Sequence, residues 1–103
     1  MSWYAYLAYF LAGALFANGV PHFVNGVSGR RFQSPFARPP GVGESSPLTN
    51  VVWGFCNFVA GCLLVWAVGG LAFGFNADML VLAMGVFVAS AGLAVYFGRV
   101  RSH

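Results

Sequence analysis

The stretch from Asn18 to Asn57 reads NGVPHFVNGVSGRRFQSPFARPPGVGESSPLTNVVWGFCN, and it holds most of the polar, charged and helix-breaking residues of the chain. Long apolar runs flank it on both sides. Glycine and proline interrupt residues 26–47 so often that neither a helical nor a strand period continues through them. The stretch therefore predicts one long connection together with the polar ends of the two helices that it joins.

The composition of the chain is that of a protein whose solvent is a lipid bilayer. Of its 103 residues, 59% are hydrophobic and 7% are charged, and the mean hydropathy is +0.77. In a typical soluble domain about a quarter of the residues are charged, so this chain lacks the polar surface that water requires. Its apolar runs approach the roughly 20 residues that a transmembrane helix needs.

We therefore predict an all-α integral membrane protein with three transmembrane helices, folded as a single domain. The spans are expected at about residues 3–24, 48–75 and 78–97, joined by an ordered Gly/Pro/Arg loop at 25–47 and a short outer turn at 74–78.

Local signals place the ends of these helices. Pro21 cannot donate a backbone hydrogen bond, so the first helix is expected to kink or end there. Ser46 is a suitable N-cap for the second helix, with Pro47 at its first position. Asn76 is expected to cap the third helix, and Gly98 to end it.

The arginines predict the orientation in the membrane. Arg30, Arg31 and Arg38 lie in the long loop, and Arg99 and Arg101 lie near the C-terminus. Basic residues favour the cytoplasmic side of a membrane, and three spans place the loop and the C-terminus on the same side. We expect both to be cytoplasmic at the inner (plasma) membrane, with the N-terminus outside. This topology also accounts for the net charge of +3, so nucleic acid is not an expected partner.

Small residues recur at helical spacing in each predicted span, as is typical of close contacts between membrane helices. They are Ala5, Ala8, Ala12, Gly54, Gly61, Gly85, Ala89 and Gly92. Such faces predict packing between helices of this chain and contact with a second copy or another membrane protein.

A polar cluster is predicted where the first two helices meet the loop. Asn18, His22 and Asn25 share one face of the first helix, and Asn50 and Asn57 belong to the second. One interpretation is hydrogen bonding that holds the two helices together. The other is a binding site for an anionic lipid head group or a small polar ligand, because the glycine-rich run at 41–46 leads into a helix N-terminus, which favours anions. The candidates are Asn18, His22, Asn25, Arg30, Arg31, Arg38, Ser45, Ser46, Asn50 and Asn57.

Catalysis, metal binding and a cofactor are not expected. His22 and Glu44 are the one His and carboxylate that the predicted topology can bring together, which is too little for an assembled active site. Cys56 and Cys62 fall on different faces of one helix, without the ligands of a metal site.

The sequence thus predicts a non-catalytic accessory or assembly subunit that contacts membrane lipids and acts through helix packing and its cytoplasmic loop. A lipid-binding or small-ligand-binding membrane protein is the first alternative. An oligomeric pore or transporter for a neutral solute is the second.

Overall fold

The computed structural model describes residues 3–71 and 73–101, which form three long helices and a small hairpin. The helices are α1 (Trp3–Val27), α2 (Pro47–Val68) and α3 (Ala77–Val100). Strands β1 (Phe32–Gln33) and β2 (Glu44–Ser45) pair antiparallel between α1 and α2. All three helices are long and apolar enough to cross a membrane. The shortest, with 22 residues, extends roughly 33 Å at about 1.5 Å per residue. The prediction of a helical protein with three candidate spans is confirmed in this form.

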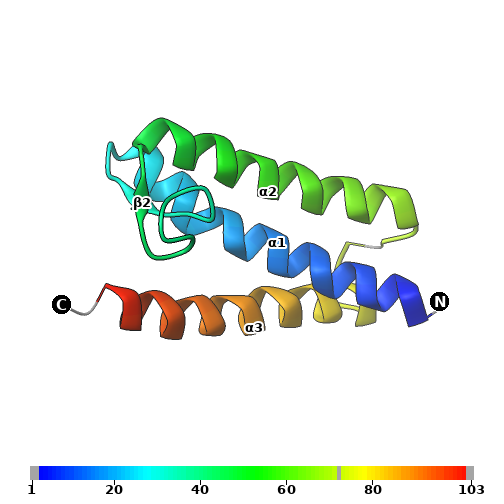
Figure 1. The fold of residues 1–103 in the computed structure, drawn as a ribbon. Helices are drawn as coiled ribbons and strands as arrows, with labels where there is room; N and C mark the ends of the chain where they lie inside the picture. The colour runs from blue at the N-terminus through cyan, green and yellow to red at the C-terminus, as the bar shows by residue number, and fades with distance from the viewer. Residues whose placement is uncertain (1–2, 72, 102–103) are drawn as a thin grey trace.

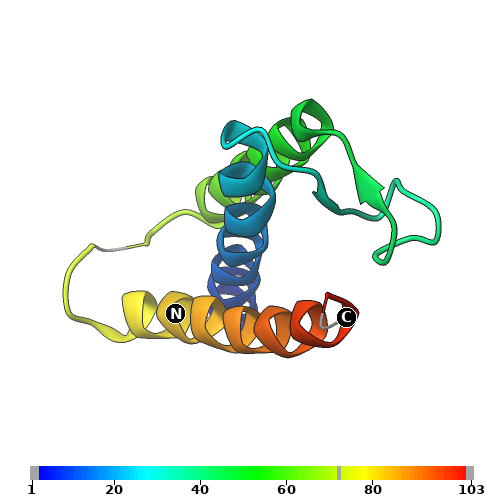
Figure 2. The same cartoon turned by 90° about the vertical axis from the view of Figure 1, so that its left-hand side faces the viewer.

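The central element is α1, which packs against both other helices (Figure 1). Figure 2 shows α2 and α3 on different sides of α1, and these two helices hardly touch each other. In consequence α1 is the most buried of the candidate spans, and α3 is the least buried. The arrangement leaves open space between α2 and α3 along one side of α1.

Glycine allows the helices to approach α1 closely. A Cβ atom added to Gly54 would lie 2.7 Å from the backbone nitrogen of Phe23 and 2.8 Å from the carbonyl oxygen of Gly19. On the other side of α1, a Cβ atom on Gly85 would collide with the backbone of Phe10. The backbones of α2 and α3 thus rest directly on the backbone of α1.

The predicted packing residues divide between contacts with α1 and open surface. Ala5, Ala8 and Ala12 are buried on α1, and Gly61 lies against the ring of Phe16. Ala89 is half-buried. A Cβ atom on Gly92 would meet nothing within 4 Å, so this end of the predicted α3 face remains uncovered by the rest of the chain.

Of the two outcomes expected at Pro21, a kink or an end, the end is wrong, because the helix continues to Val27. Proline removes a single intrahelical hydrogen bond, and neighbouring helices in membrane proteins commonly compensate for such a loss. The stop signal is instead Gly29, which has a φ of 76°. The amide of Gly29 donates to Gly26 (3.0 Å) and that of Arg30 to Asn25 (2.9 Å), which is the bonding pattern of a Schellman motif.

The expected span at 48–75 is too long, because α2 ends at Val68. Gly69 and Gly70 have φ values of 73° and 75°, a left-handed conformation that favours glycine and ends a helix. The connection to α3 is therefore longer than the predicted turn at 74–78; residue 72, inside the expected span, lies outside the described residues. Gly98 does not end α3, which continues to Val100.

Both predicted N-caps are confirmed. The Ser46 side chain accepts a hydrogen bond from the Thr49 amide (3.2 Å), and the Asn76 side chain accepts one from the Met79 amide (3.1 Å). These bonds satisfy amides that have no partner inside the helix.

The hairpin folds back onto the end of the bundle where the C-terminus lies (Figure 1). Phe32, Gln33 and Ser34 are buried. The Tyr96 hydroxyl of α3 donates to the Gly41 carbonyl (2.8 Å), and Arg101 donates to the side-chain oxygen of Gln33 (2.7 Å). The hairpin and the C-terminal end of α3, which are far apart in the sequence, are thus joined by hydrogen bonds at one end of the molecule.

Candidate functional site

Asn50, at the start of α2, connects α1, α2 and the hairpin. It is fully buried, and His22 beside it is 3% exposed. The Asn50 side-chain nitrogen lies 3.2 Å from the carbonyl oxygens of Phe32 and Ser45 and 3.1 Å from that of Ser46. Its side-chain oxygen lies 2.8 Å from Nδ1 of His22. Three carbonyl acceptors fix the orientation of the amide, with its nitrogen toward the hairpin and its oxygen toward the imidazole.

The orientation of Asn50 also fixes the tautomer of His22. An amide oxygen can only accept a hydrogen bond, so Nδ1 of the imidazole carries the proton. In a neutral ring Nε2 is then an unprotonated acceptor. The ring is held by edge contacts with Phe32, Trp53 and Phe97, with centroid distances of 5.4, 6.4 and 6.2 Å. His22 is thus a fixed acceptor in an aromatic environment.

The other predicted amides join α1 to α2 deeper in the bundle and α1 to the loop. Asn18 donates to the side-chain oxygen of Asn57 (3.0 Å), and the side-chain nitrogen of Asn57 donates to the Trp53 carbonyl (2.9 Å). Asn25 donates to the Pro21 carbonyl (2.7 Å) and accepts from Nε of Arg30 (3.1 Å). Of the predicted contacts between the two helices, Asn18–Asn57 and His22–Asn50 are present, whereas Asn25 bonds to its own helix and to the loop.

The loop arginines lie on the surface rather than beside His22. Arg30, Arg31 and Arg38 are exposed, and Arg31 donates to the Glu44 carbonyl (3.0 Å). Glu44, the carboxylate considered as a partner for His22, instead forms an ion pair with Arg101 at 3.4 Å. The structure therefore does not join His22 and Glu44 in an acid–base pair.

The glycine amides of the run at 41–46 form hydrogen bonds within the loop. The amides of Gly41 and Gly43 donate to the carbonyls of Ser34 and Pro39, each at 2.8 Å. Ser45 shares a hydrogen bond between hydroxyl groups with Ser34. The amides of residues 41–43 are thus already engaged and do not face an anion, and anionic-lipid binding at 41–46 and the exposed arginines stays a prediction.

A small cavity of about 270 Å³ lies under the hairpin, next to His22. Its walls come from all three helices and from the loop: Asn18, His22, Gln33, Ser34, Pro35, Gly41, Trp53, Leu93, Tyr96 and Phe97. None of these side chains except the imidazole can carry a charge near neutral pH. Among the described residues, no fully buried side-chain nitrogen or oxygen lacks a partner. Nε2 of His22, for which the described residues offer no hydrogen-bond partner, is therefore not fully buried, and His22 is one of the residues that line this cavity.

An apolar cleft of about 540 Å³ adjoins the small cavity, and the two share Asn18 and Leu93. Leu11, Ala14 and Leu15 of α1 form its floor, Leu64 comes from α2, and Ala89 and Gly92 come from α3. We call the two together the α2–α3 cleft. It runs from an apolar section in the middle of the helices to a polar end under the hairpin.

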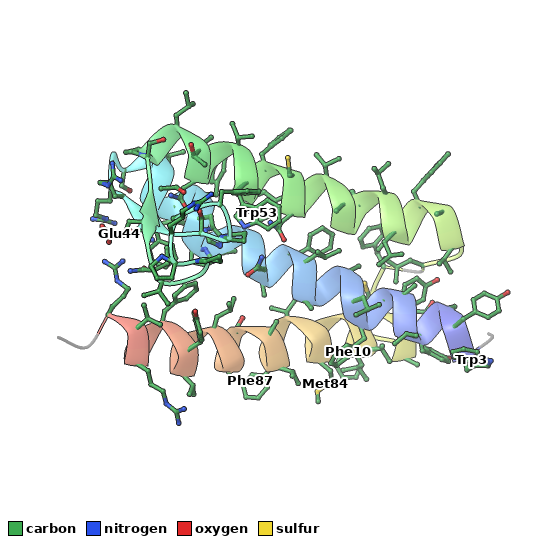
Figure 3. The ribbon with its side chains drawn as sticks, in the orientation of Figure 1. Trp3, Phe10, Glu44, Trp53, Met84 and Phe87 are labelled. Atoms are coloured by element: carbon green, nitrogen blue, oxygen red, sulfur yellow. The ribbon has the colours of Figure 1, made fainter. Side chains whose placement is uncertain are left out.

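The view with side chains shows the two environments of the helices (Figure 3). Trp53 lies at the end of the bundle that carries the hairpin and Glu44, whereas Met84 and Phe87 point away from α1 on the far side of α3. Sequence reasoning identified His22 and the asparagines but missed Gln33, Ser34, Trp53, Tyr96 and Phe97 as lining residues. The one signal for them was the aromatic content of the loop and of the end of α3, which marked no particular partner.

The chain matches no protein-family model, and it has no significant match among curated proteins or solved structures. The function is therefore argued from the geometry of the α2–α3 cleft and of the helix surfaces.

Proposed function

We propose that this chain is a non-catalytic membrane protein that binds a membrane-borne small ligand in the α2–α3 cleft. The observation that carries the proposal is the cleft itself, an open groove with an apolar section and a polar end with His22, between helices that hardly touch each other. Ligand sites are typically concave and mostly apolar, with a few polar groups that orient the ligand. This is the first alternative from the sequence, with the polar cluster as its site.

The internal hydrogen bonds support a preformed site. Asn50 and the Asn18–Asn57 pair hold α1 against α2, and Tyr96 and Arg101 hold the hairpin against α3. The walls of the cleft are thus fixed by bonds that a ligand does not have to provide. A preformed site loses less conformational entropy when the ligand binds.

Two matched variants test this proposal, because two glycines of α3 both have open space where a side chain would begin. Nothing lies within 4 Å of a Cβ atom on either Gly92 or Gly98, but only Gly92 lines the cleft. Gly92→Leu fills the apolar section, whereas Gly98→Leu adds the same side chain outside it. Both changes favour helix formation to the same extent.

Native mass spectrometry from lipid nanodiscs measures the result. We expect wild type and Gly98→Leu to retain a bound amphiphile, and Gly92→Leu to lose it. Equal retention by the two variants would place the bound molecule outside the cleft and reject the proposal.

An accessory or assembly subunit is the second candidate, favoured by the exposure of α2 and α3. The buried share of the candidate span is 17% in α2 and 6% in α3. Large side chains on these outer faces, such as Phe55, Trp66 and Phe87, are exposed. A lipid bilayer or a partner helix can cover such faces.

The native cysteines distinguish lipid from a second copy on α2. Cys56 and Cys62 are both exposed and lie about 120° apart around the helix, at about 100° per residue. Oxidative crosslinking in native membranes of Cys56→Ser and Cys62→Ser variants tests one face each. A dimer through α2 predicts a crosslink in one variant and none in the other, while absence of crosslinks in both would count against that dimer.

A further inference from the structure

We propose that the polar end of the α2–α3 cleft selects an uncharged phenol or quinol head group, whose hydroxyl donates a hydrogen bond to Nε2 of His22, with an aliphatic tail in the apolar section. The inference rests on the proposed function, that the cleft takes a membrane-borne ligand. It adds the chemistry of that ligand and the direction of the hydrogen bond.

The need for a donor follows from Asn50. Its amide nitrogen faces three carbonyl oxygens, so its oxygen faces His22 and holds the proton of the imidazole on Nδ1. Nε2 is then an acceptor that a hydroxyl can satisfy. An ether, a ketone or a quinone offers only lone pairs toward Nε2. Accommodating one of these would require either the other tautomer, which would break the bond to Asn50, or a second proton on the ring, which would place an unpaired charge among the uncharged walls of the cavity.

The absence of charge follows from the lining. Among the residues that the structure describes, no Arg, Lys, Asp or Glu side chain lines the 270 Å³ cavity. Arg101, at the C-terminal end of α3, is already engaged, since it donates to Gln33 at 2.7 Å and to the Glu44 carboxylate at 3.4 Å. A charged head group would lose its hydration without gaining an ion-pair partner in the cavity wall, which is unfavourable. An uncharged head group avoids this cost.

The preference for a ring follows from the size and walls of the cavity. An engineered cavity of about 150 Å³ is known to hold benzene, so 270 Å³ accommodates a substituted six-membered ring. Trp53, Tyr96 and Phe97 contribute aromatic side chains to the walls. Aromatic rings pack favourably edge to face and offset against one another, so these walls favour a flat aromatic head over an aliphatic one.

The tail has its own space. The apolar section has a volume of about 540 Å³ and meets the polar end at Asn18 and Leu93. Its floor and walls are otherwise leucine, alanine and glycine. Burying an alkyl chain there supplies affinity that does not depend on the head group, which lets head-group selection be measured with probes that share one tail.

Three probes with the same ten-carbon tail separate the claims. 4-Decylphenol has a ring and a donor, 4-decylanisole has the ring but no donor, and 1-decanol has a donor but no ring. Binding to the full chain in nanodiscs is measured by isothermal titration calorimetry. We expect 4-decylphenol to bind about tenfold more tightly than 4-decylanisole, which is the typical effect of one hydrogen bond to a buried acceptor, with 1-decanol weaker than the phenol.

Nitrogen-15 NMR of histidine tests the geometry directly. The chain has two histidines, so His103→Gln leaves His22 as the only labelled ring. We expect the free protein to show the Nδ1–H tautomer and an upfield shift of Nε2 on addition of 4-decylphenol, with no such shift for 4-decylanisole. His22→Phe keeps an aromatic ring without nitrogen and is expected to bind the two ring probes equally.

Each outcome bears on a separate claim. Equal affinities for phenol and anisole, or an Nε2–H tautomer in the free protein, would overturn the selection of a donor while leaving the cleft as a ligand site. Tighter binding of 1-decanol than of the phenol would overturn the ring. Failure of all three probes to bind would overturn the proposed function as well as this inference. The affinities of reduced and oxidised decylquinone are then compared in the same way, because a quinol site is expected to bind the reduced form, which has a hydroxyl donor, more tightly than the oxidised form, which has none.

Discussion

Asn50 shows how one buried side chain can determine both stability and chemistry. Its side-chain nitrogen and oxygen contact three carbonyls and His22, which belong to α1, the hairpin and the start of α2. Replacing it with leucine removes these side-chain hydrogen bonds and takes the acceptor away from the buried Nδ1–H of His22, whereas the Ser46 carbonyl keeps its bond from the backbone amide of residue 50. A hydrogen bond between membrane helices contributes only about 0.6 kcal/mol on average, but an unsatisfied buried group costs about 1–3 kcal/mol.

We therefore predict that Asn50→Leu lowers the free energy of unfolding by about 2 kcal/mol or more. The measurement is denaturant or thermal unfolding in detergent. Asn57→Leu is the matched comparison, because Asn57 makes one bond to α1 and one within its own helix, and we expect a loss of roughly 0.6 kcal/mol. If the two variants unfold alike, Asn50 does not have the central position that its contacts indicate.

The sequence predicted part of this cluster because helical spacing is visible without a structure. Asn18, His22 and Asn25 recur at the helical period, and Asn50 and Asn57 follow the same rule. The contribution of Phe32 and Ser45 was not predictable, since each strand of the hairpin has only two residues. A period needs more residues than that to be recognised, so the path of the loop over the helix ends had no local signal.

Close contact with α1 through glycine is the main packing principle of the helices. Alanine at position 54 would place a Cβ atom within 2.8 Å of backbone atoms of both Gly19 and Phe23, and backbone cannot move aside as a flexible side chain can. We predict that Gly54→Ala costs about 1–3 kcal/mol of stability, as overpacking commonly does. Gly98→Ala, where the added atom meets nothing within 4 Å, is expected to be neutral or to stabilise by up to about 1 kcal/mol. Thermal unfolding of the two variants side by side decides between these outcomes.

The hairpin is held to α3 by two side chains near the C-terminus of that helix. Tyr96 donates to the Gly41 carbonyl, and Arg101 contacts Gln33, Glu44 and the face of the Phe32 ring, 5.0 Å from its centroid. Removing both anchors is expected to release the hairpin while the helices stay packed, because the glycine contacts with α1 are elsewhere.

Hydrogen exchange measures this release. We predict that Tyr96→Phe combined with Arg101→Gln increases exchange of the amides of residues 34–43 by about tenfold, with exchange in α1 unchanged. The factor corresponds to about 1.4 kcal/mol, a typical sum for two modest hydrogen bonds. Faster exchange throughout α1 would instead show that the hairpin stabilises the whole bundle.

The limits of the helices show what composition can and cannot specify. Leu71, Phe73 and Phe75 continue the apolar run beyond α2, so hydropathy alone extended the predicted span to residue 75. The conformation of Gly69 and Gly70 ends the helix earlier, but adjacent glycines also occur within membrane helices. Conversely, Pro21 predicted a kink or an end in α1, but the helix continues past it. It ends instead at the Schellman motif that Gly29 forms.

The distribution of charge gives the molecule two different ends. The described arginines lie in the loop and at the C-terminal end of α3. These two segments are in contact, because Arg101 donates a hydrogen bond to Gln33 of the hairpin. The opposite end holds Asp78 and the connection from α2 to α3, where the Tyr9 hydroxyl of α1 donates to the Gly69 carbonyl (2.8 Å). Because basic residues are retained in the cytoplasm, this polarity predicts the hairpin end inside and the 69–76 connection outside.

Cysteine labelling tests that orientation. In a background of Cys56→Ser and Cys62→Ser, a single thiol is introduced by Ser28→Cys at the hairpin end or by Phe75→Cys, at a side chain that is 97% exposed in the opposite connection. A membrane-impermeant maleimide added to intact cells is expected to react with the thiol at 75 and to reach the thiol at 28 only after the membrane is opened. A C-terminal tag should share the protection of position 28, since three spans place both on one side. Reaction of both thiols from outside would be incompatible with three helices crossing the bilayer in this arrangement, and labelling at 28 alone would reverse the orientation that the arginines predict.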